Sequence, residues 1–182
     1  PSVTVAFMNR AKAMQRQGLD VLSFAAGEPD FDTPELIKDA AIKALRAGQT
    51  KYMPTLGDPE SRAAIAAKLT TENRIPGCTT DHIAIAAGGK HALFVACHCL
   101  LDPPPQGQPA QEVIIPVPAW VSYAPIAELA GGKIVEVSTT PEKGFLPTAE
   151  DIRRVISPRS RLLILNSPSN PLGVMYPEKL LR

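Results

Sequence analysis

The sequence predicts an α/β fold, in which an N-terminal arm and helix precede the first part of a mostly parallel sheet. From residue 83 onward, short apolar runs typical of strands alternate with segments of helical spacing. Such alternation is typical of βαβ units that build a buried parallel sheet. The 182 residues are 45% hydrophobic and 20% charged, which suits a globular chain and argues against disorder. The 19 prolines, about twice the usual share, mark breaks between elements.

Three helices are expected in the first part of the chain. The first runs from Val5 to Gln17, with Phe7, Ala11 and Met14 facing inward and Gly18 at its end. The other two begin at Thr33-Pro34-Glu35 and at Asp58-Pro59-Glu60, each with an N-cap residue, a proline at the first helical position and an acid. They end near Gly48 and Asn73.

The second part of the chain alternates strands and helices. The expected order is strand Ile83–Ala87, helix Lys90–Leu101, strand Glu112–Pro116, helix Trp120–Ala130, strand Lys133–Ser138, a short helix opened by Thr148, strand Arg161–Asn166 and a helix from Pro177. A proline-rich surface loop over residues 102–111 connects a helix to a strand. Residues 1–50 therefore form an arm with a helix, and residues 51–182 begin an α/β domain.

Charge, hydropathy and cysteine content exclude several classes of protein. A net charge of +1 gives no electrostatic reason to bind nucleic acid or an anionic membrane, and no apolar run approaches the roughly 18 residues of a membrane span. Three cysteines, Cys78, Cys97 and Cys99, favour neither a disulfide framework nor a metal site. They are expected to be buried free thiols in a reducing compartment. With no signal-peptide apolar region at the start, a cytoplasmic location is expected.

Three features lie where expected strands lead into loops, the edge at which open α/β sheets bind ligands. Gly88-Gly89-Lys90 opens a helix whose free N–H groups can hold a phosphate. Trp120 can stack on a planar ring, and Asn170 lies in a rigid turn that can present its amide. Taken singly, each has a plainer explanation: a tight turn, a core aromatic, and an Asx turn. Together they predict a phosphorylated, planar aromatic cofactor.

The sequence resembles the class-I aminotransferases of pyridoxal-phosphate fold type I, especially their bacterial aspartate/prephenate branch. The resemblance rests on six stretches in the family's order, which extend over nearly the whole chain. They are Phe24-Ala-Ala-Gly-Glu-Pro-Asp-Phe-Asp-Thr-Pro34, Thr50-Lys-Tyr-Met-Pro54, Gly88-Gly-Lys-His-Ala-Leu93, Pro118-Ala-Trp-Val-Ser-Tyr123, Ala130-Gly-Gly132 and Asn166-Ser-Pro-Ser-Asn-Pro-Leu-Gly173.

The resemblance implies the fold of a three-layer α/β/α pyridoxal-phosphate transferase, with residues 1–50 in the arm and small domain and residues 51–182 in an incomplete large domain. It implies pyridoxal 5'-phosphate as cofactor, an amino acid and a 2-oxo acid as substrates, aspartate as the expected donor, and a homodimer.

The same resemblance implies a role for each site residue. Gly27 contacts the substrate α-carboxylate, and Tyr52 reaches the cofactor phosphate of the partner subunit. Gly89 and Lys90 offer backbone N–H groups to the phosphate. Trp120 stacks on the ring and borders the substrate. Asn170 bonds the cofactor's 3-oxygen beside the substrate carboxylate.

Parts of the family's machinery are not expected in these residues. The lysine that binds the cofactor, the acid at its ring nitrogen and the arginine for the substrate carboxylate all follow the Asn-Pro-x-Gly turn by a good distance in the family. The chain ends nine residues after Gly173, so we expect a fragment without catalytic residues that is inactive alone. Leu172 replaces the family's usual threonine, and the bend is expected to survive. The loop at 102–111 is longer than usual and is expected to lie opposite the cleft.

Other functions stay open at this point. A β-lyase or an aminocyclopropane carboxylate synthase of the same fold type would share this region. An aminotransferase-like effector domain of a transcription regulator would have a DNA-binding domain upstream. A non-catalytic α/β ligand-binding domain would leave Gly89, Trp120 and Asn170 scattered.

Overall fold

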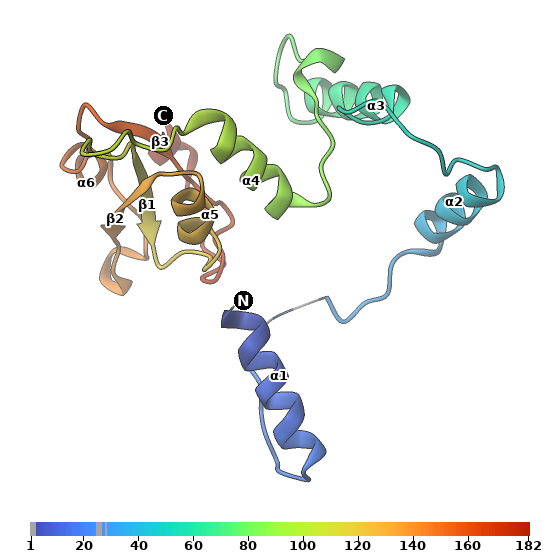
Figure 1. The fold of residues 1–182 in the computed structure, drawn as a ribbon, viewed down its shortest axis with the longest axis horizontal. Coiled ribbons are helices and arrows are strands. Elements are labelled where there is room, and N and C mark those ends of the chain that lie inside the picture. The colour runs from blue at the N-terminus through green and yellow to red at the C-terminus, as the bar shows by residue number, and fades with distance from the viewer. Residues whose placement is uncertain (1–2, 25–26, 28) are drawn as a thin grey trace. The chain divides into compact units, whose positions relative to one another are not determined.

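The computed structural model describes residues 3–24, 27 and 29–182. Ala25, Ala26 and Glu28, which belong to the matching stretch 24–34, lie outside the described residues. The chain divides into two compact units, Pro1–Tyr52 and Met53–Arg182. Figure 1 shows the course of the chain and the labels of its elements.

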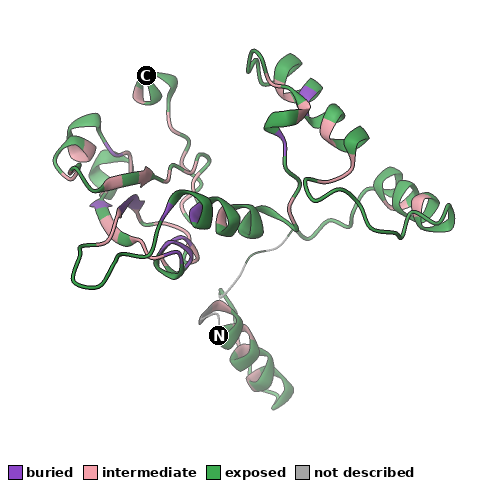
Figure 2. Ribbon diagram, turned by 45° about the horizontal axis from the view of Figure 1, so that its top comes forward, coloured by how far each residue is buried: buried purple, intermediate pink, exposed green. Residues whose placement is uncertain are grey.

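The first unit contains the helices α1 (Val3–Arg16) and α2 (Glu35–Arg46). The face of α1 that was expected to point inward, with Phe7 and Met14, lines an apolar groove together with Leu22 and Phe24. Phe7 is still 58% exposed, so the unit itself buries this face only in part. Figure 2 shows α1 and α2 largely in the colour of exposed residues.

The beginning of α2 corrects one prediction. Thr33 was expected to cap this helix, with Pro34 as its first residue. Instead Pro34 holds the N-cap position without a side-chain cap, and its carbonyl accepts the N–H of Ile37 at 2.9 Å. The hydroxyl of Thr33 therefore makes no cap, because the helix begins one residue later than the Thr-Pro-Glu pattern predicts.

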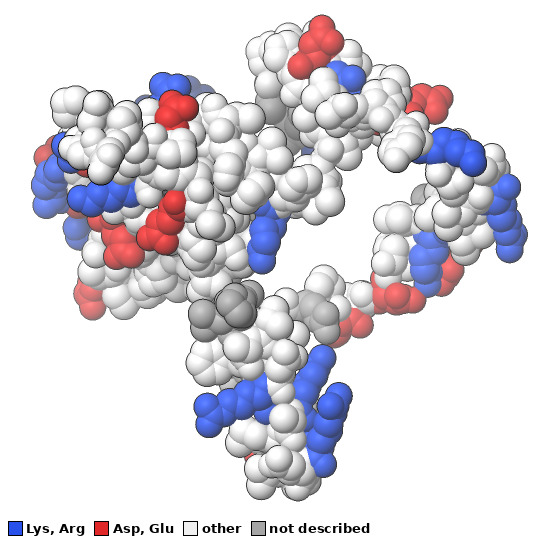
Figure 3. Space-filling model, viewed as in Figure 1, with Lys and Arg blue, Asp and Glu red and all other residues white. Residues whose placement is uncertain are grey.

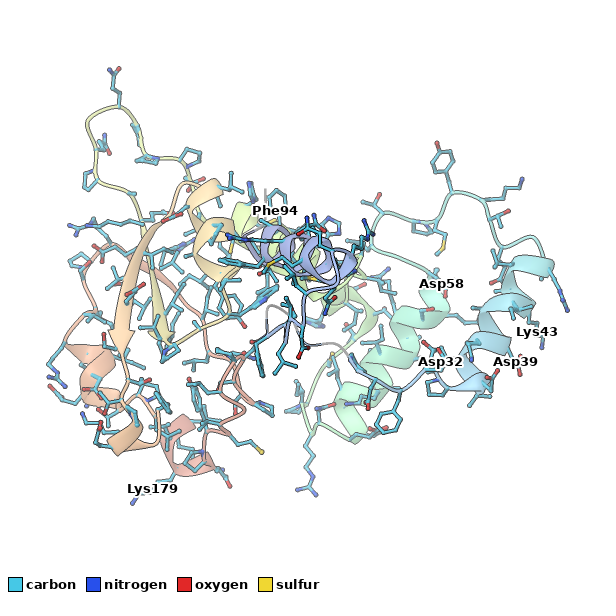
Figure 4. The ribbon with its side chains drawn as sticks, turned by 90° about the horizontal axis from the view of Figure 1, so that it is seen from below. Asp32, Asp39, Lys43, Asp58, Phe94 and Lys179 are labelled. Carbon is cyan, nitrogen blue, oxygen red and sulfur yellow. The ribbon has the colours of Figure 1, made fainter. Side chains whose placement is uncertain are left out.

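In the second unit, α3 (Pro59–Thr71) begins as predicted. The carboxylate of Asp58 accepts the N–H of Ser61 at 2.8 Å. Hydrogen bonds from the backbone and the side chain of Ser61 lower the pKa of Asp58. Figure 4 labels Asp58 at the start of this helix. The guanidinium of Arg62 donates to the carbonyl of Ile83 at 2.9 Å, which ties α3 to the segment that follows the short 3-10 helix η1 (Thr80–His82).

The strand predicted over Ile83–Ala87 does not form. Ile83 has extended backbone angles and is buried, but the segment makes no ladder with another strand of the described chain. The N–H of Ile85 donates to the carbonyl of Leu56, at 2.9 Å. Apolar composition favours extended backbone here, but a strand also needs a neighbour to receive its hydrogen bonds.

Three parallel strands form the sheet in the order β2-β1-β3. β1 spans Glu112–Val117, β2 spans Lys133–Ser138 as predicted, and β3 spans Ser160–Leu163. β3 is shorter than the predicted Arg161–Asn166, because the chain leaves the ladder after Leu163. Only the central strand is buried along nearly its whole length, whereas both outer strands are largely half-buried or exposed.

Helices lie on both faces of the sheet. Val113 and Ile115 of β1 pack in one cluster with Cys97 of α4 (Gly89–Leu100) and Ile126 of α5 (Tyr123–Leu129). On the other side, α6 (Ala149–Arg153) and α7 (Glu178–Leu181) line a groove along β3. A short 3-10 helix, η2 (Pro141–Lys143), follows β2. The predicted three-layer α/β/α arrangement is therefore confirmed.

Helix α5 begins later than predicted and ends at a glycine. It begins at Tyr123, three residues later than predicted, because Trp120 to Ser122 form a turn in which the Trp120 carbonyl accepts the N–H of Tyr123 at 3.1 Å. It ends before Gly131, whose φ is +89°. A Cβ at Gly131 would lie 2.6 Å from the Cα of Pro103, so the proline-rich loop packs directly on this glycine.

A polar cluster holds the amino ends of β1 and β3 together. Glu112 is 4% exposed. Its carboxylate accepts the hydroxyl of Ser157 at 2.5 Å and the Nε–H of Arg159 at 3.0 Å. These bonds, that from Ser157 foremost, lower the pKa of Glu112. The proline-rich loop enters β1 at this end, opposite the carboxyl edge of the sheet, as expected.

The cysteines only partly match the expectation of buried thiols. Cys97 is buried, and burial raises its pKa. Cys78 is half-buried and Cys99 is exposed on α4. Among the described residues, no helix combines the length and apolar character needed to cross a membrane.

Candidate functional site

The amino end of α4 presents unpaired backbone donors. Gly88 is the N-cap, with φ +87°. Within the described chain, no acceptor is bonded by the N–H groups of Gly89, Lys90 and His91, the first three residues of the helix. Nothing lies within 4 Å of a Cβ built on Gly89, so the described chain does not pack against this residue. Free N–H groups at the positive end of a helix favour an anion.

The side chain of Lys90 links this turn to Trp120. Its Nζ lies 5.0 Å from the centroid of the indole, a cation–π contact of about 0.5–1 kcal/mol when exposed. The two residues are 30 positions apart, so the fold brings them together. The contact also places the start of α4 beside the carboxyl end of β1, because Trp120 follows that strand by three residues.

Trp120 is half-buried and is oriented by a second aromatic side chain. The rings of Trp120 and Tyr123 meet edge to face, with centroids 5.3 Å apart and an interplanar angle of 85°, a favoured arrangement for aromatic pairs. Tyr123 is 9% exposed, and its burial raises the pKa of its hydroxyl. Both rings line a hollow at the end of β1.

The segment after β3 is a turn held by its own hydrogen bonds. The side-chain oxygen of Asn166 accepts the N–H of Asn170 at 2.8 Å. The carbonyl of Ser169 accepts the N–H of Gly173, at 2.7 Å, and Gly173 has φ +69°. The bend therefore forms with Leu172 in place of the family's usual threonine, as predicted.

Asn170 and the end of β1 face one hollow. Pro118, Ala119 and Tyr123, which follow β1, line it together with Asn166 and Asn170, which follow β3. The chain passes from β1 to β2 on one side and then returns to β3 on the other. Such a reversal of strand order opens a crevice at the carboxyl edge, where α/β proteins bind ligands. The hollow lies at that position.

Four of the six predicted site residues thus lie in the second unit. Lys90 contacts Trp120, Gly89 adjoins Lys90 at the start of α4, and Asn170 lies across the hollow from the residues just before Trp120. Gly27 and Tyr52 belong to the first unit. Tyr52 is fully exposed, and a Cβ on Gly27 would touch nothing within 4 Å.

The sequence interpretation missed three residues of this region. Tyr176 lines the hollow beside Asn170, and burial, with a smaller contribution from the nearby Tyr123, raises its pKa. Asn166 orients the Asn170 turn, and His91 accepts a backbone N–H at the start of α4. The position of His91, third in the helix, is a recognisable signal, whereas Tyr176 comes near Tyr123 from a distant segment of the chain and no local pattern indicates this.

Free N–H donors, an indole and an amide thus lie near the carboxyl edge of a parallel α/β sheet, the edge at which α/β proteins bind small ligands. The model of the family described as "Aminotransferase class I and II" matches residues 19–182. The chain therefore belongs to this aminotransferase family.

Individual relatives and solved structures agree with this assignment. The chain is 47% identical over 181 residues to an aspartate/prephenate aminotransferase of Thermus thermophilus, matching 100% of the chain and 45% of that protein. It is 40% identical over 179 residues to an aspartate aminotransferase of Bacillus subtilis, and this match covers 98% of the chain and 44% of that protein. The structure of the Thermus thermophilus aspartate aminotransferase with maleate superposes with a TM-score of 0.92 at 47% identity, over 100% of this chain and 46% of that one.

The chain spans about half the length of the curated relatives it matches. The similarity extends over both units and includes all six sequence stretches on which the family resemblance rests.

Proposed function

We propose that the chain is the N-terminal part of an aminotransferase that moves the amino group of an L-amino acid to a 2-oxo acid with pyridoxal 5'-phosphate. Family membership supports the reaction class. The observation that carries the proposal is the grouping of three free N–H donors, Lys90, Trp120 and the Asn170 turn at one edge of the sheet. The donors suit a phosphate, the indole suits a planar ring, and the amide suits a ring oxygen.

The hydrogen-bonding groups and the aromatic ring of these residues suit the phosphate, the ring and the ring oxygen of the cofactor. When bound, pyridoxal phosphate supplies an electron sink for bond cleavage at the substrate's α-carbon. The N–H groups of Gly89 and Lys90 hold the phosphate. Trp120 covers one face of the ring and excludes water from it. The side-chain amide of Asn170 donates to the 3-oxygen and so favours its anionic form.

The remaining roles belong to the first unit. We propose that the backbone of Gly27 contacts the substrate α-carboxylate, and that Tyr52 reaches the phosphate bound by the other subunit of a homodimer. The full exposure of Tyr52 suits a residue that acts on a partner chain. Residues 1–50 then belong to the arm and small domain, and residues 51–182 to the cofactor-binding domain. A cytoplasmic location stays a prediction.

Aspartate is the proposed amino donor. Relatives at 40–48% identity are named aspartate or aspartate/prephenate aminotransferases. The similar Thermus thermophilus structure holds maleate, a four-carbon dicarboxylate like aspartate. The covalent lysine, the acid at the ring nitrogen and the arginine clamp are proposed to lie in sequence beyond residue 182.

The cofactor proposal can be tested by the emission of Trp120, the single tryptophan of the chain. Titration with pyridoxal phosphate should quench this emission to saturation, inorganic phosphate should compete, and pyridoxal, which lacks the phosphate, should bind at least tenfold more weakly. Equal affinity for pyridoxal, or no quenching at all, would contradict the phosphate site.

Two further measurements test the rest of the proposal. Borohydride reduction followed by peptide mapping should find no cofactor-linked lysine within residues 1–182, and these residues alone should show no turnover. A linked lysine with turnover would overturn the assignment of the lysine to another segment. The protein from the complete reading frame should convert aspartate and 2-oxoglutarate to oxaloacetate and glutamate. Release of a thiol or ammonia instead would identify a lyase of the same fold type.

A further inference from the structure

The two glycines of the turn that leads into α4 have no packing partner in the described chain. A Cβ built on Gly88 or Gly89 would meet no atom within 4 Å. Glycine has more backbone freedom to lose on ordering than any other residue. Two successive glycines in open space therefore depend on hydrogen bonds for a defined shape.

Three hydrogen bonds define this turn. The N–H of Gly88 donates to the carbonyl of Ala86 at 2.8 Å, and the N–H of Ala92 donates to the carbonyl of Gly88 at 3.1 Å. The third comes from the N–H of Ala87, which donates to Nδ1 of His91 at 3.2 Å. Among the described residues, this is the one bond to the turn that a side chain makes.

His91 is the third residue of α4. At this position the Glu or Gln of a capping box turns back to a backbone N–H that precedes the helix, and His91 makes the same kind of return. To accept the bond, Nδ1 must present its lone pair, so the ring proton lies on Nε2. The bond uses the N–H of Ala87 and leaves those of Gly89, Lys90 and His91 free.

We propose that His91 is a positioning residue for phosphate binding, which holds the entry into α4 so that the free N–H groups are aligned before the ligand arrives. The inference rests on the proposed function for the identity of the ligand and adds a residue to it. Donors that are already ordered cost less entropy to use than donors that ligand binding must order. The exposed bond from Ala87 is open to competition by water, so we expect a moderate effect.

The chain contains a matched control for this bond. In η1, the N–H of Thr79 donates to Nδ1 of His82 at 3.1 Å. His82 is likewise exposed and likewise the third residue of its helix, but it is not part of the turn before α4. Its removal deletes the same kind of hydrogen bond, together with a contact of Nδ1 with the Thr79 hydroxyl at 3.0 Å, without touching the proposed phosphate donors.

The experiment compares His91→Ala, His91→Gln and His82→Ala in the protein from the complete reading frame that contains residues 1–182. Pyridoxal phosphate affinity is measured by fluorescence, with pyridoxal as the phosphate-free probe. We expect His91→Ala to weaken pyridoxal phosphate binding about fivefold, which corresponds to about 1 kcal/mol, with no change for pyridoxal. His91→Gln, which keeps an acceptor, and His82→Ala should both stay within twofold of the wild type.

Amide hydrogen exchange gives a readout that needs no ligand. The N–H of Ala87 should exchange faster in His91→Ala than in the wild type and in His91→Gln. Unchanged exchange at Ala87, or unchanged pyridoxal phosphate affinity in His91→Ala, overturns the role of His91. If the wild-type protein binds no pyridoxal phosphate, the proposed function is overturned instead. Amide exchange at Ala87 then tests only whether the hydrogen bond from Ala87 to His91 forms. Equal weakening by His82→Ala would show a general loss of stability and would also overturn the proposal.

Discussion

Replacement of Gly131 by alanine should destabilise the α/β unit more than an exposed glycine replacement of the same kind. Gly131 has φ +89°, and the left-handed region costs an L-residue roughly 1–2 kcal/mol. In addition, the new Cβ would lie 2.6 Å from Cα and 2.9 Å from N of Pro103. These are backbone atoms, so relief requires a shift of the chain, and overpacking of this kind costs roughly 1–3 kcal/mol. The expected loss is about 2–5 kcal/mol, a large part of the 5–15 kcal/mol that holds a typical domain together.

Gly107 supplies the control, because it separates the two contributions. Its φ is +80° and its Cβ would meet nothing within 4 Å. Gly107→Ala therefore bears only the backbone cost, about 1–2 kcal/mol. Both variants can be unfolded with urea while the emission of Trp120 is recorded, since that residue packs against the core of this unit.

The expected result is a clear separation of the unfolding midpoints. With a urea dependence of about 2 kcal/mol per molar, a loss of 3 kcal/mol in Gly131→Ala lowers the midpoint by about 1.5 M. Equal midpoints for Gly131→Ala and Gly107→Ala would show that the contact with Pro103 does not constrain the folded chain, and would refute the packing of the proline-rich loop on this glycine.

Three further predictions concern the same unit. Bonds from Ser157 and then Arg159 lower the pKa of Glu112 in the folded protein. The stability that the ionised carboxylate supplies is therefore complete above its unfolded-state pKa of about 4.3 and is lost as the pH falls through the lower folded-state pKa. Urea unfolding from pH 7 to 3 should show this loss of stability in the wild type and a smaller loss in Glu112→Gln, which is less stable at pH 7. Val113 is completely buried, so Val113→Ala should cost about 2 kcal/mol in the same assay, and a loss below 0.5 kcal/mol would argue against its central place in the core. Lys90→Met removes the ammonium from the indole face and should alter the emission of the folded protein, whereas Lys90→Arg should preserve it; unchanged emission in Lys90→Met would contradict the contact.

Local patterns were sufficient to predict most elements of the second unit. The bounds of β2 agree with the prediction, and α6 opens at Thr148 as predicted, with Asp151 as its capping partner. The segment Ile83–Ala87 shows the limit of such patterns. Alternation and apolar character predict extended backbone, but pairing depends on a second segment that composition cannot name.

The candidate site divides in the same way. Gly89, Trp120 and Asn170 could be found from the sequence, because each follows an apolar run at a position where α/β proteins bind ligands. The ammonium of Lys90 over the indole could not be found, because the contact joins residues 30 positions apart in the chain. For Lys90, the family resemblance predicted a role only for the backbone N–H, as a donor to the phosphate.

The register of the sheet also bears on the order in which it assembles. Glu112 pairs with Lys133 in β2 and with Ser160 in β3, so the second pairing closes a loop more than twice as long as the first. Loop-closure entropy makes the longer closure costlier by about 0.7 kcal/mol. We therefore expect β1, α5 and β2 to associate early in folding, with β3 docking afterwards. The ion pair between Arg159 and Glu112 lies where that later closure occurs, and in kinetic experiments its loss should speed the undocking of β3 more than it slows the first association.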